Sequence, residues 1–154
     1  MIERKLEKTA SGEWLASFTI NHGYSVQRVW ELLTNDEHVK KWHPELRMND
    51  LRENGSITFQ FEDGESHELP IREFVDGKIL GFDWYGSYIH FEVKENGQLL
   101  MTLQVKEVNE QSLRDLTGWT MISEAIDATS RGESFTFDKE KAAEIRREYE
   151  RELG

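Results

Sequence analysis

Hydrophobic and polar residues alternate through most of the first 108 residues of the chain, a pattern typical of β-strands. The first such run covers residues 13–20, and Asn21-His22-Gly23 ends it. Later runs cover residues 46–52, 57–61, 67–74, 79–85, 88–94 and 99–108. Asn-Gly and Asp-Gly pairs, which favour tight turns, separate several of these runs. The pattern predicts an antiparallel sheet of about six to seven strands.

Two short helical patterns follow the first strand. Ser25 is a typical N-cap for the first helix, whose apolar face would hold Val26, Val29, Trp30 and Leu33. Asn35 or Asp36 would begin the second helix, and His43-Pro44 would end it.

A third periodic pattern, from residue 112 to residue 131, predicts one long helix. Its apolar stripe holds Leu113, Leu116, Trp119, Ile122, Ile126 and Thr129. Ser112 and Asp115 are typical of a capping-box start, and Gly132 is a natural stop. Because the helix follows a run of strands, it can bury its stripe only by lying across the sheet, in an α+β fold. Gly118 would let the helix approach the sheet or leave space beside Trp119.

Length and composition favour one acidic domain. The chain has 154 residues, enough for one core; residues 1–132 would form its body, and residues 133–154 a charged extension of the same domain. The absence of cysteine excludes disulfides and thiolate metal sites and fits a reducing cytoplasm. Residues 1–8 alternate in charge, and no apolar run reaches membrane-spanning length, so we expect a cytoplasmic protein. A net charge of −11 argues against nucleic-acid and membrane partners.

Three local motifs support a resemblance to a known family. Residues 25–42, the Leu80-Gly81-Phe82-Asp83-Trp84 strand and the Gly118-Trp119 pair resemble the activator of heat-shock-chaperone ATPase branch of the START-like, helix-grip (SRPBCC) superfamily. The resemblance covers residues 13–131. The chain departs from the branch at Pro44-Glu45-Leu46 and in residues 138–154. The resemblance implies a curved antiparallel sheet crossed by the long helix, with a cavity between them.

Alternation along the strands then nominates the residues that would line this cavity. They are Phe59, Phe61, Leu69, Ile71, Phe82, Trp84, Phe91, Met101, Leu103, Trp119, Ile122 and Ile126. The alternative is a solid core, in which the same side chains pack together and leave no pocket. Arg72 and Lys106 fall on the opposite side of their strands, so a ligand in the cavity would be neutral or cationic rather than anionic.

The sequence does not predict a catalytic or metal site. His67 and Glu73 share the inward parity, but we expect both to be at least partly exposed. His38 and His43 are five residues apart and Pro44 follows them, which is poor spacing for a metal. The chain has neither a Gly-x-Ser-x-Gly elbow nor a glycine-rich phosphate loop, so we expect no cofactor.

The charged extension carries a narrow apolar line, formed by Ala142, Ile145, Tyr149 and Leu153. This line would either pin a helix to its own domain or dock on a second copy, so we expect a monomer or a weak homodimer. We expect the protein to bind a hydrophobic or amphipathic small molecule without catalysis. The alternatives are an interaction module that modulates a chaperone ATPase, which the family suggests, and a small-molecule enzyme using cavity acids.

Overall fold

The computed structural model describes residues 2–21 and 24–154, which form one sheet and four helices. The elements are β1 (Ile2–Lys8), β2 (Trp14–Ile20), α1 (Val26–Thr34), α2 (Asp36–Trp42), β3 (Leu46–Asp50), β4 (Ser56–Gln60), β5 (Ser66–Val75), β6 (Ile79–Trp84), β7 (Ser87–Val93), β8 (Leu99–Val105), α3 (Glu110–Ser130) and α4 (Lys139–Leu153). The strands form one antiparallel sheet in the order β1-β2-β8-β7-β6-β5-β4-β3. The predicted α+β helix-grip fold is confirmed, with eight strands instead of six to seven.

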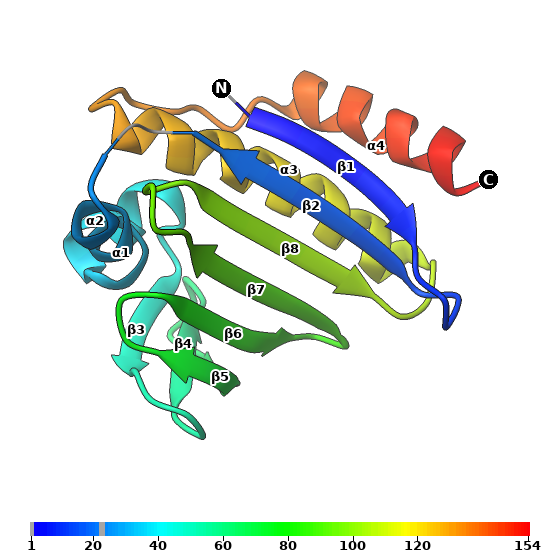
Figure 1. Ribbon diagram of the computed structural model, residues 1–154. Coiled ribbons are helices and arrows are strands. Elements are labelled where there is room, and N and C mark those ends of the chain that lie inside the picture. Colours follow the sequence, from blue (N-terminus) through cyan, green and yellow to red (C-terminus); the bar gives the residue numbers. More distant parts are fainter. Residues whose placement is uncertain (1, 22–23) are drawn as a thin grey trace.

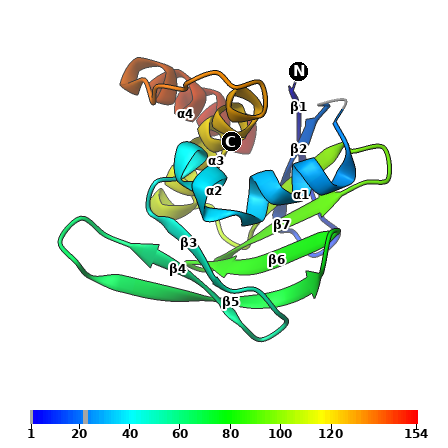
Figure 2. The same ribbon diagram turned by 90° about the vertical axis from the view of Figure 1, so that its left-hand side faces the viewer.

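Figure 1 shows the curved sheet crossed by α3, with α4 running beside α3. At one end of this arrangement α2 packs on α3, and α1 contacts both α3 and β7 (Figure 2). The predicted caps of these two short helices are confirmed. The Ser25 side chain accepts from the Arg28 backbone N–H, and Asn35 accepts from that of Glu37. His22 and Gly23, which were predicted to end the first strand, lie outside the described residues.

The additional strand is β1, which the sequence pattern did not predict. It pairs with β2 from Ile2↔Ile20 to Lys8↔Trp14 and forms one edge of the sheet. Its half-buried side chains are those of Ile2, Arg4 and Leu6, so the period of two is present. The pattern was hidden because a charged residue occupies the middle inward position. Arg4 is accommodated there by α4: its guanidinium lies 4.6 Å from the centre of the Tyr149 ring and donates to Glu152 at 2.8 Å.

The start of α3 also differs from the prediction. The N-cap is Asn109, whose side chain accepts from the Ser112 backbone N–H, and the Ser112 hydroxyl accepts from that of Asn109. Ser112 is therefore the third helical residue of a capping box and not its first. Asp115 takes no part in the cap. The strands β3, β6 and β8 are also shorter than predicted and end at Asp50, Trp84 and Val105.

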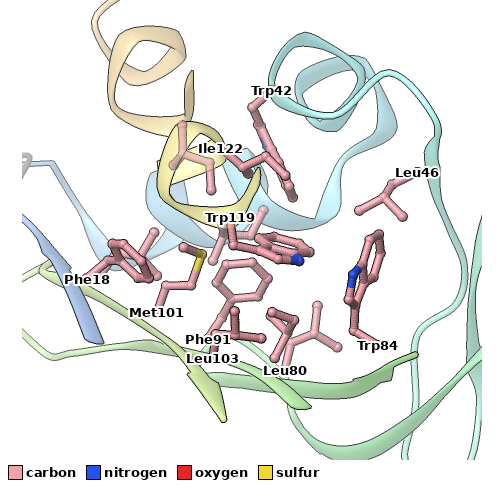
Figure 3. Close-up of a cluster of buried hydrophobic side chains, with 14 of the residues drawn as sticks. Phe18, Trp42, Leu46, Leu80, Trp84, Phe91, Met101, Leu103, Trp119 and Ile122 are labelled. Atoms are coloured by element: carbon pink, nitrogen blue, oxygen red, sulfur yellow. The ribbon is translucent and has the colours of Figure 1, made fainter. Parts of the chain in front are cut away.

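The core lies between the sheet and α3 and is rich in aromatic rings. Figure 3 shows the Trp119 ring reaching from α3 toward the sheet, beside Trp84 and near Phe91. The ring centres of Trp119 lie 5.1 Å from Trp84, 6.3 Å from Phe82 and 6.4 Å from Phe91. Trp42 on α2 closes one side of the core, and its indole N–H donates to the Leu32 carbonyl at 2.9 Å. None of the helices within residues 2–21 and 24–154 has the length and apolar character to span a membrane.

Candidate functional site

Ten of the twelve residues nominated for a cavity are buried, and Phe59 and Phe61 are half-buried. The alternation along the strands and the spacing along α3 therefore placed these side chains on the faces that point to the core. The centre of the core is occupied by the close aromatic contacts around Trp119, however. Space for a ligand lies instead at the edge of the core, where α3, the segment after α2, β4 and the β6–β7 turn meet. We call this region the mouth; it contains three hollows, two of which share a lining residue.

The first hollow, the Gly118 crevice, is predominantly apolar. It is lined by Trp42, His43, Pro44, Glu45, Gly118, Met121, Ile122 and Phe137, and its volume is about 210 Å³. A Cβ atom on Gly118 would meet nothing within 4 Å. Close approach to the sheet, one of the two roles considered for Gly118, is therefore wrong. Open space does lie beside Gly118, but Trp119, where the other role placed it, is not among the lining residues of the crevice. Phe137, from the segment before α4, is 47% exposed and forms the outer wall.

The second hollow, the acidic groove, shares Glu45 with the crevice. Its other lining residues are Phe59, Phe61, Glu62 and Asp63, and its volume is about 370 Å³. The two Phe rings have centres 4.6 Å apart, and Phe59 continues inward to Trp84 at 5.4 Å and to His43 at 5.7 Å. The groove therefore combines aromatic faces with three carboxylates.

The third hollow, the Asp115 pocket, is polar and has a volume of about 260 Å³. It is lined by Tyr85, Gly86, Ser87, Lys106, Glu107, Asn109, Gln111, Ser112 and Asp115. The Asp115 carboxylate is buried and accepts from the Trp84 indole N–H at 3.2 Å, from the Gln111 amide at 2.9 Å and from the Ser87 hydroxyl at 3.5 Å. Burial raises the pKa of this carboxyl, and the three hydrogen bonds act in the opposite direction. Because its oxygens accept from Trp84 and Ser87, Asp115 fastens α3 to the β6–β7 turn.

Tyr85 lies between these hollows in a strained backbone conformation. Tyr85 and Gly86 form the turn between the paired residues Trp84 and Ser87, and the φ of Tyr85 is 44°. A left-handed conformation costs a residue with a side chain about 1–2 kcal/mol, and Asn or Asp is the usual choice there. The strained position directs the ring over the mouth, 5.4 Å from Trp84 and 6.3 Å from Phe59, and its hydroxyl shares a 2.9 Å hydrogen bond with His67.

His43 and Glu45 place a polar pair where the crevice and the groove join. His43 is 8% exposed and packs against Trp42, Trp84 and Trp119. Its Nδ1 lies 3.2 Å from Glu45 Oε2, a distance typical of an ion pair, but the geometry of a hydrogen bond is not met. The His43 ring, more than any other neighbour, lowers the pKa of the Glu45 carboxyl. The mouth therefore carries a carboxylate that stays ionised at neutral pH.

The other polar candidates lie away from the core. His67 and Glu73 are exposed, as expected. Glu73 accepts from the Tyr88 hydroxyl at 2.6 Å on the outer face of the sheet. His38 and His43 border different pockets. Throughout residues 2–21 and 24–154, no three or more His, Asp or Glu side chains are grouped to hold a metal ion.

Comparison with known families identifies the chain. Residues 23–130 match the family described as "Activator of Hsp90 ATPase homolog 1-like protein", so the match spans well over half of the sequence. The chain belongs to this family. The match to the Activator of Hsp90 ATPase homolog 1-like family includes all lining residues of the acidic groove and of the Asp115 pocket. It also includes every lining residue of the Gly118 crevice except Phe137. Phe137 and α4 lie beyond the match. A search of curated proteins gave no match.

Solved structures support the same fold. A conserved protein of unknown function from Enterococcus faecalis, EF2215, superposes with a TM-score of 0.81 at 23% identity, covering 98% of this chain and 90% of that one. CalU16 from Micromonospora echinospora superposes with a TM-score of 0.69 at 20% identity, covering 96% and 94% of the two chains. A protein from Bordetella parapertussis, BPP1335, superposes with a TM-score of 0.67 at 12% identity, covering 97% of this chain and 90% of that one. At these identities the likeness shows the fold alone.

Several residues of the mouth were not among the predicted site residues. Pro44 was noted as the end of the second helix and, with Glu45, as a departure from the family pattern, and Asp115 was noted only as a cap. Tyr85 ended a predicted strand, and Phe137 belonged to the predicted charged extension, residues 133–154. One available signal was Tyr85-Gly86, because a two-residue turn that begins with a bulky residue is unusual.

Proposed function

We propose that the protein binds a small apolar or amphipathic molecule at the mouth, with the apolar part of the ligand in the Gly118 crevice. The observation that carries this proposal is Gly118 itself. A glycine in a helix interior costs about 1 kcal/mol relative to alanine. Steric crowding does not explain the glycine, because a Cβ atom at position 118 would have open space around it. The glycine therefore preserves the volume of the crevice.

The surroundings of Gly118 support a binding role. Trp42, Met121, Ile122 and Phe137 supply apolar walls, and the polar pair of His43 and Glu45 stands at one end. Few polar groups within an apolar hollow are typical of small-molecule sites. Of the large apolar side chains that are exposed among the described residues, two, Tyr85 and Phe137, border the mouth.

The volume of the crevice limits what enters it. A dry cavity of about 150 Å³ holds one benzene, whereas drug-sized ligands occupy roughly 300–1,000 Å³. At about 210 Å³ the crevice would hold one ring or a short alkyl chain, and the remainder of a larger ligand would extend over the acidic groove.

A series of variants at position 118 tests the proposal. We expect Gly118→Ala to raise the free energy of unfolding by about 0.4–1 kcal/mol, since alanine favours the helix. We expect Gly118→Leu to fill the crevice and abolish binding of 2-phenylethanol, a neutral one-ring probe. Binding is followed through the five Trp indole signals in ¹H–¹⁵N correlation spectra; Trp42 and Trp119 should shift, and Trp14, on β2, should not.

Arg114→Leu is the matched control, because it adds the same side chain to an exposed position of α3 outside the crevice. It should leave binding of the probe unchanged. Equal binding of 2-phenylethanol by the wild type and Gly118→Leu would contradict the proposal.

A further inference from the structure

We infer that the ligand is an amphipathic cation, with its positive group held in the acidic groove and its apolar group in the Gly118 crevice. This inference rests on the proposed function and specifies the chemical class of its ligand. The two hollows share one residue, Glu45, so a ligand that occupies both must pass its carboxylate.

Acidic side chains predominate around this junction, although Arg47 is close enough to contribute to the lowered pKa of Glu45. Glu45, Glu62 and Asp63 line the groove, and neither hollow has a Lys or Arg among its lining residues. Arg47, two residues after Glu45, directs its guanidinium to the main-chain carbonyls of Pro44 and Leu46, at 2.7 and 2.8 Å. A carboxylate ligand would lose its hydration here and meet negative charge. A cation would meet an ionised Glu45.

The aromatic faces favour the same class of ligand. A cation within about 6 Å of a ring centre is attracted by the ring quadrupole. Phe59 and Phe61 are half-buried, and they line the groove together with the three carboxylates. Aromatic faces flanked by acids are a recognised way to hold an ammonium group, and an apolar hollow beside them selects an amphipathic one.

His43 contributes to the junction through its contact with Glu45. It is more than nine-tenths buried and lines the crevice, and its Nδ1 lies 3.2 Å from Glu45 Oε2. The His43 ring lowers the pKa of the Glu45 carboxyl, so an ammonium at the junction would meet an ionised carboxylate. A phosphocholine headgroup fits less well, because its phosphate would face the same acids.

Three probes with the same phenylethyl group test the inference: 2-phenylethylammonium, 2-phenylethanol and 3-phenylpropionate. Dissociation constants are measured from the Trp indole signals at neutral pH and about 0.15 M salt, which screens the general attraction of an acidic protein for cations. We expect the ammonium to bind about tenfold more tightly than the alcohol, and the carboxylate to bind most weakly.

Glu45→Gln should weaken ammonium binding about threefold to fivefold and leave binding of the alcohol unchanged. Phe61→Leu should weaken ammonium binding about twofold to fivefold through the lost aromatic face. Glu95→Gln is the control. It removes the same charge at an exposed position in the β7–β8 turn, far along the chain from the groove, and should change the affinity for neither the ammonium nor the alcohol. A dispersed spectrum confirms that each variant is folded.

The possible failures are distinguishable. Equal affinity for the ammonium and the alcohol would overturn the inference and leave the proposed function standing. Equal weakening by Glu45→Gln and Glu95→Gln would show a general charge effect and would also overturn it. If none of the three probes shifted the Trp signals, both the inference and the proposed function would be wrong.

Discussion

Two residues at the mouth, Gly118 and Tyr85, contradict local conformational preference. Gly118 is a glycine inside helix α3. Tyr85 is a tyrosine at a turn position with positive φ, where asparagine is favoured. Each choice lowers stability by about 1 kcal/mol. Proteins keep such departures mainly at functional sites, where the residue serves binding at the expense of folding. That both border the same hollowed region supports a binding role for that region.

Exchanging Tyr85 for asparagine should therefore stabilise the protein and weaken binding. We expect Tyr85→Asn to raise the free energy of unfolding by about 1 kcal/mol, since Asn-Gly is the favoured pair for this turn. We expect weaker binding of an aromatic cation, because the ring beside Phe59 is lost. Urea denaturation and the indole titration measure the two effects. Tyr85→Phe, which keeps the ring and the strain, is the control; a fall in stability for Tyr85→Asn would refute the argument.

The helical elements follow their sequence patterns closely. The predicted inward face of α1 is confirmed, since Val29, Trp30 and Leu33 are buried and Val26 packs at its edge. The Trp30 ring lies 5.8 Å from that of Phe74 on β5, so it joins a helix to the sheet.

Trp30→Ala should be among the most destabilising single changes in the protein. Truncating a buried Trp typically costs about 3–5 kcal/mol, which is a large share of the stability of a domain of this size. Chemical denaturation measures the loss. Gln27→Ala, on the exposed side of α1, is the comparison and should change stability by less than about 0.5 kcal/mol. A loss below about 1 kcal/mol for Trp30→Ala would be inconsistent with the observed burial.

The sequence predicted the helices and strands whose patterns depend on neighbouring residues. It failed for β1, whose pattern depends on residues far along the chain. Alternation and spacing predicted the seven strands from residue 14 onward and the faces of α1 and α3. β1 escaped prediction because Arg4 fills an inward position, and its partners, Tyr149 and Glu152, belong to the far end of the chain. The helix start was misplaced because both Asn109 and Ser112 suit an N-cap, and only the geometry distinguishes them.

The site was harder to predict than the fold for a related reason. Residues 43–45, Gly118 and Phe137 belong to three separate segments, and no periodicity connects them. Ten of the twelve nominated cavity residues are buried in the interior, but periodicity does not show how completely large rings fill a volume. The open space arises at the edge of the ring cluster, where two segments without regular structure border α3.

At the scale of the whole molecule, α4 joins both ends of the described chain to the helix-grip body. Ile145 and Tyr149 are buried, the Tyr149 hydroxyl shares a 2.5 Å hydrogen bond with Thr120 on α3, and Arg4 stacks on the same ring. The apolar line of the extension is therefore turned toward its own domain. We propose from this that α4 belongs to one cooperative unit with residues 1–132.

Unfolding should accordingly show one transition. Far-ultraviolet circular dichroism, which includes α4, and Trp fluorescence, which reports on residues outside α4, should give coincident curves. Tyr149→Phe, which keeps the ring and removes the hydroxyl that bonds Thr120, should cost about 0.5–1.5 kcal/mol and shift both curves together. An earlier transition seen by circular dichroism alone would show that α4 unfolds separately.

The central position of β8 beside β2 affects the order in which the fold can assemble. β2 pairs with β1 on one side and, from Ile20↔Leu99 to Trp14↔Val105, with β8 on the other. During synthesis at about 5–20 residues per second, the β1–β2 hairpin waits roughly 4–16 s for its second partner. A two-stranded hairpin is marginal in water, and its open edge is a template for pairing with other chains. The strands made first are thus the last to be secured, and the nascent chain is most vulnerable to aggregation until β8 has left the ribosome.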